Sequence, residues 1–332
     1  MNLQMRINLL ARLGEFILSD DREWLEAKEK ASRQNSWFTP GFIDLALRNI
    51  STQFLQKGVL ERFAADYNLP DINPIPKSIG IIMAGNIPLV GFHDFLCLFI
   101  SGNKIRIKPS SRDEVLIKFM VKKLEQWEPS LAGLISFEEM LKGCDAYIAT
   151  GSNNSSRYFE YYFSKYPHII RRNRTSVAVL DGKESLEQLQ LLADDVYLFF
   201  GLGCRNVTKI YIPAGYDFIP LLKAFDKYNY FKDHNSYRNN YDYNLALLIL
   251  NRSFYMTNES VILSENKAVF SRISMLHYEF YTDKNEVLDQ LKSSEEIQCI
   301  AGNGFIPFGK TQCPSLSDFA DGVDTLKFLK NL

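Results

Sequence analysis

The chain has 332 residues, of which 46% are hydrophobic and 23% are charged. This composition is typical of globular proteins and excludes a disordered or fibrous one, and the length allows about two domains. The 38 Lys and Arg residues are balanced by 39 Asp and Glu residues, so the net charge is −1 and nothing favours a nucleic-acid partner.

The cysteines and histidines give no sign of a metal site. There are five cysteines and four histidines, all widely spaced and without a C-x-x-C pair, so neither zinc nor a disulfide framework is expected. Reduced cysteines, and an N-terminus without a basic region and a cleavage site, favour a cytoplasmic protein. The longest apolar stretch, 79–100, contains Asn86, Pro88, His93 and Asp94, so no integral membrane span is expected.

Secondary structure is predicted in two parts. Residues 1–75 are predicted to be helical, and we then expect strands at 78–84, 104–108, 146–149 and 176–180, with helices at 86–101, 114–126 and 153–165. From about residue 183 we expect strands at 207–212, near 260 and at 278–281, with helices at 185–200, 218–228 and around 243–251. Strands that alternate with helices indicate βαβ units, and hence an α/β fold with parallel sheets.

Three predicted turns directly follow predicted strands of the first part. They are Ala84-Gly85-Asn86-Ile87-Pro88, Lys108-Pro109-Ser110-Ser111 and Thr150-Gly151-Ser152. Open parallel sheets bind ligands at the carboxyl ends of their strands, and the third turn opens a helix whose N-terminus suits a phosphate. Asn86 can donate a hydrogen bond into a cleft, and the simpler alternative is that it only caps the next helix. No G-x-G-x-x-G is present, which disfavours an ordinary dinucleotide-binding dehydrogenase.

Cys204 is the most informative cysteine, because it ends a Gly201-Leu202-Gly203-Cys204 turn before a predicted strand. Glycines allow backbone conformations that are closed to other residues, so this turn can present the thiol to a cleft. A thiolate there would be a nucleophile. The alternative is a small buried apolar residue, which is the commoner fate of a free cysteine.

Taken in order, these motifs resemble the aldehyde dehydrogenase superfamily, and most closely its acyl-CoA reductase branch, which is related to the fatty acyl reductase of bacterial bioluminescence. The most specific segment is GLGCRNVTKIYIP, because this branch carries a G-x-G-C-R-N-V-[ST]-K stretch around its nucleophile. The segments AGNIPLVGFHDF, IRIKPSS and ATGS match the superfamily's Asn-Pro, Lys-Pro-Ser and Thr-Gly-Ser turns. The resemblance extends from about residue 78 to 213, and residues 307–310 match the superfamily pattern more weakly.

The resemblance implies two lobes, each with a mainly parallel sheet flanked by helices. A cofactor-binding lobe is expected at 1–182 plus 306–332, and a catalytic lobe at 183–305. Cys204 would attack an acyl thioester, and Asn86 together with the Cys204 backbone N–H would form the oxyanion hole. The implied cofactor-binding residues are Lys108, Ser110, Ser111, Thr150, Gly151 and Ser152, with Lys108 at the adenosine ribose and Ser152 at the pyrophosphate.

The implied activity is reduction of acyl-CoA, fatty acyl in particular, to aldehyde and CoA by NADPH. Two alternatives stay open: a reductase of acyl groups delivered as acyl phosphate or by a partner synthetase, and a non-catalytic scaffold that kept the fold. The chain is shorter than most superfamily members, which leaves the oligomeric state open between a monomer and a dimer.

Two departures from the superfamily pattern bear on the reaction and the cofactor. Arg171 stands where hydrolytic members have the glutamate that activates water, so attack of water on an acyl-enzyme is disfavoured. The alternative without a functional role is that Arg171 and Arg172 belong to a solvated strand edge. Ser111 and Arg112 replace the glutamate that binds the ribose hydroxyls of NAD, which favours the 2′-phosphate of NADPH. Asp113 and Glu114 weaken that preference, and NADH stays an alternative.

Two further positions are ambiguous. Glu279 is a loose candidate for the superfamily's second active-site glutamate. The polar and aromatic stretch 234–243 is expected to be a surface loop, and the alternative is that His234 and Arg238 serve CoA.

Overall fold

The structure is a computed structural model that describes residues 1–332, apart from the side chain of Asn153. It divides the chain into two compact units, which are Met1–Asn173 with Pro314–Leu332 (unit 1) and Arg174–Cys313 (unit 2). The first boundary lies earlier than the expected one at residue 182. The reason is that strand β6 (Thr175–Val179) pairs with strands of the second sheet. The second boundary likewise lies at 313 rather than 305, so residues 306–313 belong to unit 2.

Unit 1 contains a five-stranded sheet in the order β3-β2-β1-β4-β5, with every neighbouring pair parallel. Its strands are β1 (Ser78–Ile82), β2 (Lys104–Lys108), β3 (Ile135–Phe137), β4 (Ala146–Thr150) and β5 (His168–Arg171). Its longer helices are α1 (Leu3–Phe16), α2 (Arg22–Gln34), α3 (Pro40–Asn49), α4 (Lys57–Asp66), α5 (Phe92–Ile100), α6 (Val115–Trp127), α7 (Asn153–Phe163) and α12 (Thr325–Lys330). Short helical turns are η1 (Ile50–Phe54), η2 (Pro129–Leu131) and η5 (Ala320–Gly322).

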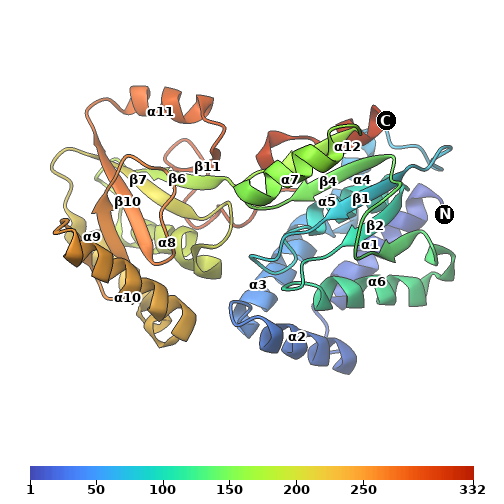
Figure 1. The fold of residues 1–332 in the computed structure, drawn as a ribbon, viewed down its shortest axis with the longest axis horizontal. Helices are drawn as coiled ribbons and strands as arrows, with labels where there is room; N and C mark the ends of the chain where they lie inside the picture. Colours follow the sequence, from blue (N-terminus) through green and yellow to red (C-terminus); the bar gives the residue numbers. More distant parts are fainter. The chain divides into compact units, whose positions relative to one another are not determined.

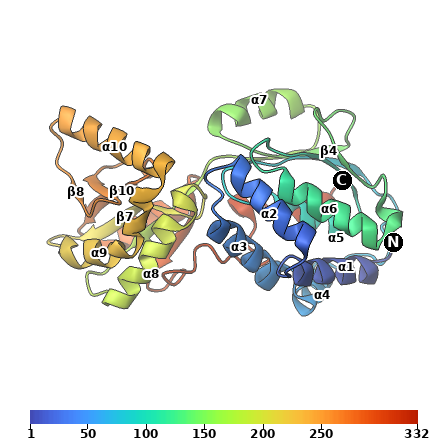
Figure 2. The same cartoon turned by 90° about the horizontal axis from the view of Figure 1, so that it is seen from below.

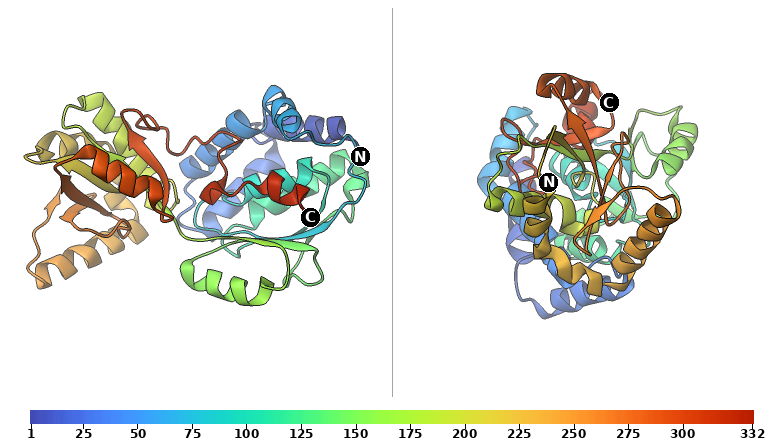
Figure 3. Two further views of the ribbon diagram at one scale, coloured as in Figure 1. Left: turned by 90° about the horizontal axis from the view of Figure 1, so that it is seen from above. Right: turned by 90° about the vertical axis from the view of Figure 1, so that its left-hand side faces the viewer.

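Helices cover both faces of this sheet, which explains why β1 and β4 are continuous apolar runs. Figure 2 shows α7 on one face and α1, α5 and α6 on the other. The C-terminal helix α12 lies on the same face as α5 (Figure 3). On the α7 face, Tyr147 of β4 stacks on Phe163 at a ring distance of 4.1 Å.

Unit 2 contains a six-stranded sheet in the order β11-β6-β7-β10-β9-β8, parallel except for the β8–β9 pair. Its remaining strands are β7 (Val207–Pro213), β8 (Met256–Thr257), β9 (Ile262–Glu265), β10 (Met275–Tyr281) and β11 (Ile297–Gly302). Its helices are α8 (Leu186–Tyr197), α9 (Phe218–Phe225), η4 (Asp226–Asp233), α10 (Asn235–Leu250) and α11 (Lys284–Ser293), and η3 (Leu198–Gly201) is a tight turn after α8. Figure 1 shows α11 on one face of the sheet and α8, α9 and α10 on the other. The predicted α/β class with two mainly parallel sheets is confirmed.

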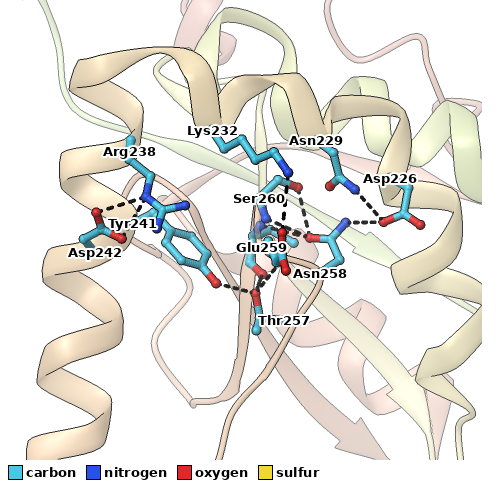
Figure 4. A network of polar contacts seen from close by, with 11 residues as sticks. Asp226, Asn229, Lys232, Arg238, Tyr241, Asp242, Thr257, Asn258, Glu259 and Ser260 are labelled. Atoms are coloured by element: carbon cyan, nitrogen blue, oxygen red, sulfur yellow. Dashed lines mark hydrogen bonds and ion pairs between the residues drawn. The ribbon is translucent and has the colours of Figure 1, made fainter.

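The expected surface loop at 234–243 is wrong, because this stretch is the first half of α10. His234 is the N-cap and accepts a hydrogen bond from the Tyr237 N–H through Nδ1. The residues at helical spacing face inward and use their polar groups: the Tyr237 hydroxyl donates to Ser260 O and the Tyr241 hydroxyl bonds the Thr257 hydroxyl. Figure 4 shows this network, in which the segment 257–260 is bound from both α10 and η4. The polar and aromatic residues therefore serve packing, which a search for aliphatic periodicity overlooks.

Arg171 is buried in unit 1, so the alternative of a solvated strand edge is wrong for this residue, whereas Arg172 next to it is exposed. Its Nε donates to Asp94 Oδ2 at 2.8 Å and one terminal nitrogen donates to Asp94 Oδ1 at 2.7 Å. The Thr325 hydroxyl, at the start of α12, lies 2.8 Å from both groups. Burial by itself raises the pKa of Asp94, but the Arg171 guanidinium outweighs it and holds that pKa below its ordinary value. The arginine thus joins β5, α5 and α12.

Candidate active site

The three predicted turns of unit 1 lie at one edge of its sheet. In the register, Ile82 at the end of β1 stands opposite Lys108 of β2 on one side and Ala149 of β4 on the other. The seven residues proposed from this unit follow or end these adjacent strands: Asn86, Lys108, Ser110, Ser111, Thr150, Gly151 and Ser152. The chain runs from β1 outward to β2 and later returns to place β4 on the opposite side of β1. This is a topological switch point, where open α/β sheets bind their ligands.

The turn that carries Asn86 is longer than predicted. The expected helix at 86–101 begins only at Phe92, and residues 86–91 form a turn. Leu89 has a φ of 57°, a left-handed conformation that a right-handed helix cannot contain and that costs about 1–2 kcal/mol for a residue with a Cβ. Asn86 therefore does not cap α5, whose N-cap is Gly91. The Asn86 side chain is exposed.

The Asn86 turn packs on the turn that follows β2. A Cβ on Gly85 would come within 2.6 Å of Ser110 Oγ, so only a glycine allows this approach. The Leu89 N–H donates to Asp113 Oδ2 at 2.6 Å. Burial raises the pKa of Asp113 to about 7, although the Leu89 bond opposes that shift. Arg112 is exposed whereas Asp113 is turned inward, so the acidic neighbour that weakened the NADPH preference is engaged elsewhere.

The raised pKa of Asp113 makes a prediction for stability. Its pKa is about 7 in the folded chain and near 3.9 when unfolded, so folding binds a proton between these values. The free energy of unfolding therefore falls as the pH rises through this window and is lowest above it. Asparagine does not titrate, so the free energy of unfolding of Asp113→Asn should not fall in this way. Measured by urea denaturation, the difference in free energy of unfolding between the variant and wild type should shift in favour of the variant by about 2–3 kcal/mol from pH 5 to pH 8. A difference between the two proteins that does not change with pH would contradict the assignment.

The N-terminus of α7 forms the third part of this edge. Ser152 is the N-cap, and its Oγ accepts from the Ser155 N–H at 3.3 Å. A Cβ on Gly151 would lie 2.8 Å from the Phe159 ring and 2.9 Å from Ser155 Cβ, so glycine is required where the turn meets the helix. This helix has 11 residues, and the start of such a helix attracts anions such as phosphates.

Cys204 lies in unit 2, on a tight turn between α8 and β7. After α8 ends, Phe199, Phe200 and Gly201 have φ values of 55°, 56° and 74°, three consecutive left-handed residues. Each non-glycine residue of this kind costs about 1–2 kcal/mol, which surrounding contacts must offset. Phe200 is buried, with its ring centroid 4.6 Å from that of Phe231 and 4.4 Å from that of His234. Cys204 itself is half-buried.

Asn206 braces this turn, and the sequence reasoning did not single it out. The residue is fully buried; its Oδ1 accepts from the Gly203 N–H at 2.8 Å. Its Nδ2 donates to three carbonyls at the end of α8, those of Asp195, Val196 and Leu198. One amide thus satisfies the helix end and holds the residue before Cys204. The signal was present in the sequence as an asparagine two residues after the cysteine and directly before a strand.

Removing this brace has a predictable cost. Asn206→Ala leaves the buried Gly203 N–H without its acceptor and three carbonyls without their donor. We expect the free energy of unfolding to fall by about 3–5 kcal/mol, measured by urea denaturation followed by circular dichroism. Asn240→Ala is the matched control, because Asn240 on α10 makes one hydrogen bond, to Ser236 O. A loss at Asn206 no larger than at Asn240 would contradict the role of the brace.

A serine and a second cysteine lie beside the Cys204 turn. The Ser176 hydroxyl donates to Cys204 O at 3.0 Å and lies 3.0 Å from Cys299 Sγ. Cys299 belongs to β11, at the point where the register with β6 shifts. These bonds fix the backbone of Cys204 against the sheet.

The segment around 307–311 is tied to the same helix end. Asp195 is buried and accepts from the N–H groups of Gly309 and Thr311 at 2.7 and 3.1 Å, and from the Thr311 hydroxyl at 2.7 Å. Burial raises the pKa of Asp195 to about 6, and these bonds oppose the shift. The last turn of α8 therefore anchors both the Cys204 turn and the Pro307–Lys310 motif.

Two positions that the sequence left ambiguous, Glu279 and Arg238, each form an ion pair. Glu279 forms an ion pair with buried Lys209 and stands opposite Tyr211, four residues beyond the start of β7. At about 3.3 Å per residue this is roughly 13 Å along the strand from the end that carries Cys204. Arg238 pairs with Asp242 on the surface of α10.

Within the described residues, no group of three or more His, Cys, Asp or Glu side chains could hold a metal ion. In the same part of the chain, no helix is both long and apolar enough to cross a membrane.

Comparisons with known proteins agree with this architecture. A family profile described as acyl-CoA reductase (LuxC) matches residues 48–217, which is just over half of the chain and includes Asn86, Cys204 and Asn206. No curated protein matches the sequence.

Similar solved structures include aldehyde dehydrogenase 21 from Physcomitrella patens, with a TM-score of 0.67 and 12% identity over 91% of this chain and 74% of that one. An NAD-dependent benzaldehyde dehydrogenase from Corynebacterium glutamicum has a TM-score of 0.65 and 14% identity over 91% and 76%. An aldehyde dehydrogenase from Mycobacterium tuberculosis, complexed with NAD+, has 0.63 and 14% over 87% and 70%. The chain therefore belongs to the acyl-CoA reductase (LuxC) family of oxidoreductases and has the aldehyde dehydrogenase fold.

Proposed function

We propose that the chain reduces acyl-CoA, fatty acyl in particular, to aldehyde and CoA, with NADPH as the reductant and a thioester on Cys204 as the intermediate. The observation that carries the proposal is the Cys204 turn. Asn206, Ser176 and three left-handed residues hold this half-buried thiol on a constrained loop at the start of β7. A cysteine that served only as a small apolar residue would not require such a loop.

The chemistry assigned to the chain's own groups is nucleophilic. The Cys204 thiolate attacks the carbonyl carbon of the acyl-CoA, and the Asn86 amide and the Cys204 N–H stabilise the oxyanion. The bond to the CoA sulfur then breaks, and CoA leaves as a thiolate that takes up a proton. When bound, the nicotinamide supplies a hydride to the acyl carbon. The Cys204 thiolate departs as the aldehyde forms, which regenerates the nucleophile.

The residues at the sheet edge of unit 1 fit a dinucleotide. The α7 N-terminus with Ser152 suits the pyrophosphate, and Lys108 is exposed at the end of β2 for the adenosine ribose. Ser111 and Arg112 are both exposed and neither is acidic, which supports NADPH over NADH because a guanidinium binds a 2′-phosphate. Three of the similar structures are complexes with NAD+ or NAD, which supports a nicotinamide cofactor.

The burial of Arg171 supports reduction rather than hydrolysis. The position where hydrolytic relatives have a base is here a guanidinium locked to Asp94. Without a base at that position to activate water, the acyl-enzyme persists until it is reduced or returned to CoA.

The test is an assay of the purified chain with short-, medium- and long-chain acyl-CoAs. Oxidation of NADPH and of NADH is followed separately, with release of CoA as the second readout. We expect NADPH oxidation matched by CoA release, and greater activity with NADPH than with NADH. Turnover only with an acyl phosphate, or only after addition of an acyl-activating synthetase, would overturn the proposed donor. No turnover and no nucleotide binding would favour the scaffold.

A further inference from the structure

Asp113 carries a buried carboxylate that the proposed reaction does not use. Only 6% of the residue is exposed. One oxygen accepts from the Leu89 N–H at 2.6 Å, and the other is buried without a hydrogen-bond partner among the described residues. Burying a carboxylate in this way costs free energy, because water no longer solvates it. We therefore look for the role of Asp113 in the hydrogen bond that its side chain accepts from the Leu89 N–H.

That bond holds the turn that presents Asn86. Leu89 is left-handed, and its carbonyl accepts from the Phe92 N–H at 2.9 Å, where α5 begins. The Asp113 carboxylate fixes Leu89 in this conformation, and with it the backbone between Asn86 and the helix. Leu89 follows Asn86 by only three residues, so fixing the Leu89 backbone restricts how far the Asn86 side-chain amide can move.

A second contact holds the other side of Asn86. Gly85 packs against Ser110, and a Cβ there would lie 2.6 Å from Ser110 Oγ. The turn 108–113 thus contacts the Asn86 turn both before and after the asparagine. This turn makes its own bonds without the carboxylate, because the Asp113 N–H donates to Ser110 O and the Arg112 N–H donates to Ser110 Oγ. The side chain of Asp113 therefore serves the neighbouring turn rather than its own.

We propose that Asp113 is a positioning residue for Asn86: through Leu89 it holds the Asn86 turn in place against the turn 108–113. The inference rests on the proposed function, in which Asn86 donates to the oxyanion. Because an oxyanion donor acts mainly in the transition state, the positioning sets kcat rather than substrate binding.

A double-mutant cycle tests the proposal by kinetics. Asp113→Ala should lower kcat by about 10- to 100-fold, while the KM values for acyl-CoA and NADPH stay within about threefold. Asp113→Asn keeps an acceptor oxygen for the Leu89 N–H and should retain most of kcat. Asp113→Ala combined with Asn86→Ala should be no slower than Asn86→Ala alone, because both changes remove the same donor. Losses that multiply in the double variant would overturn the proposal.

Amide hydrogen exchange of the full-length chain provides a readout that does not depend on activity. The 84–91 segment should exchange faster in Asp113→Ala than in wild type, and Asp113→Asn should resemble wild type. Gly85→Ala perturbs the opposite contact and is the second variant if Asp113→Ala does not fold; it should also lower kcat. Unchanged exchange in this segment overturns the tie at Leu89. An inactive wild type instead overturns the proposed function, so the two failures are distinguishable.

Discussion

Replacing Cys204 by alanine is expected to lower NADPH-dependent reduction of acyl-CoA by about a thousandfold or more. Loss of a covalent nucleophile removes the intermediate on which both half-reactions depend, and what remains is catalysis by binding alone. The side chain is half-buried, so the change should leave the circular dichroism spectrum and the urea midpoint near those of wild type. Steady-state assays with each acyl-CoA measure the effect.

Cys313→Ala is the matched control, because Cys313 is also half-buried in unit 2 and burial raises the pKa of its thiol. It should keep nearly full activity. Incubation with acyl-CoA in the absence of reductant should add one acyl mass to wild type and to Cys313→Ala, but not to Cys204→Ala. Acylation of the Cys204 variant, or full activity without that thiol, would show that the nucleophile lies elsewhere.

Arg171→Leu is expected to lower the free energy of unfolding by about 3–5 kcal/mol. The change leaves the Asp94 carboxylate buried without its counter-ion and removes the bond to Thr325. The C-terminal helix α12 should detach first, because the guanidinium joins it to α5 and β5. Urea denaturation measures the loss, and limited proteolysis near residue 325 reports the detachment.

The neighbouring arginine gives the control. Arg172 is exposed and pairs with Glu160 at the surface, so Arg172→Leu should change the free energy of unfolding by less than about 1 kcal/mol. Equal effects at the two positions would contradict a special role for the buried pair. If the Arg171→Leu variant is stable but hydrolyses acyl-CoA to free acid, the arginine suppresses attack of water on the acyl-enzyme directly.

Local pattern was sufficient to predict the strands that carry the site. Strands were predicted at 78–84, 104–108 and 146–149 from short runs that end in turn residues, and the structure has strands at Ser78–Ile82, Lys104–Lys108 and Ala146–Thr150. The parallel order also follows from the alternation with helices, since βαβ connections leave few arrangements. The short outer strands β3, β5, β8 and β11 were missed, because a run of two to six residues without a clear period resembles a loop.

Contacts distant in the sequence account for the main errors. The alternative of a solvated strand edge stayed open for Arg171, because its partners Asp94 and Thr325 are 77 and 154 residues away. The Asn86 turn looked like a helix start, because the left-handed conformation of Leu89 is stabilised by Asp113, 24 residues away. In each case the role of a buried polar group depends on a hydrogen-bond partner that is distant in the sequence.

The sequence by itself determined the family, the strands that carry the site and the identity of the candidate nucleophile, because motifs and apolar periodicity are local properties. Only the tertiary structure decided how those motifs are held. It showed that Asn206 satisfies both a helix end and the Cys204 turn, that β6 joins the second sheet, and that Asp113 supports the turn before α5. Burial makes every unsatisfied polar group costly, so the chain's polar residues are assigned their roles only when folding chooses their partners.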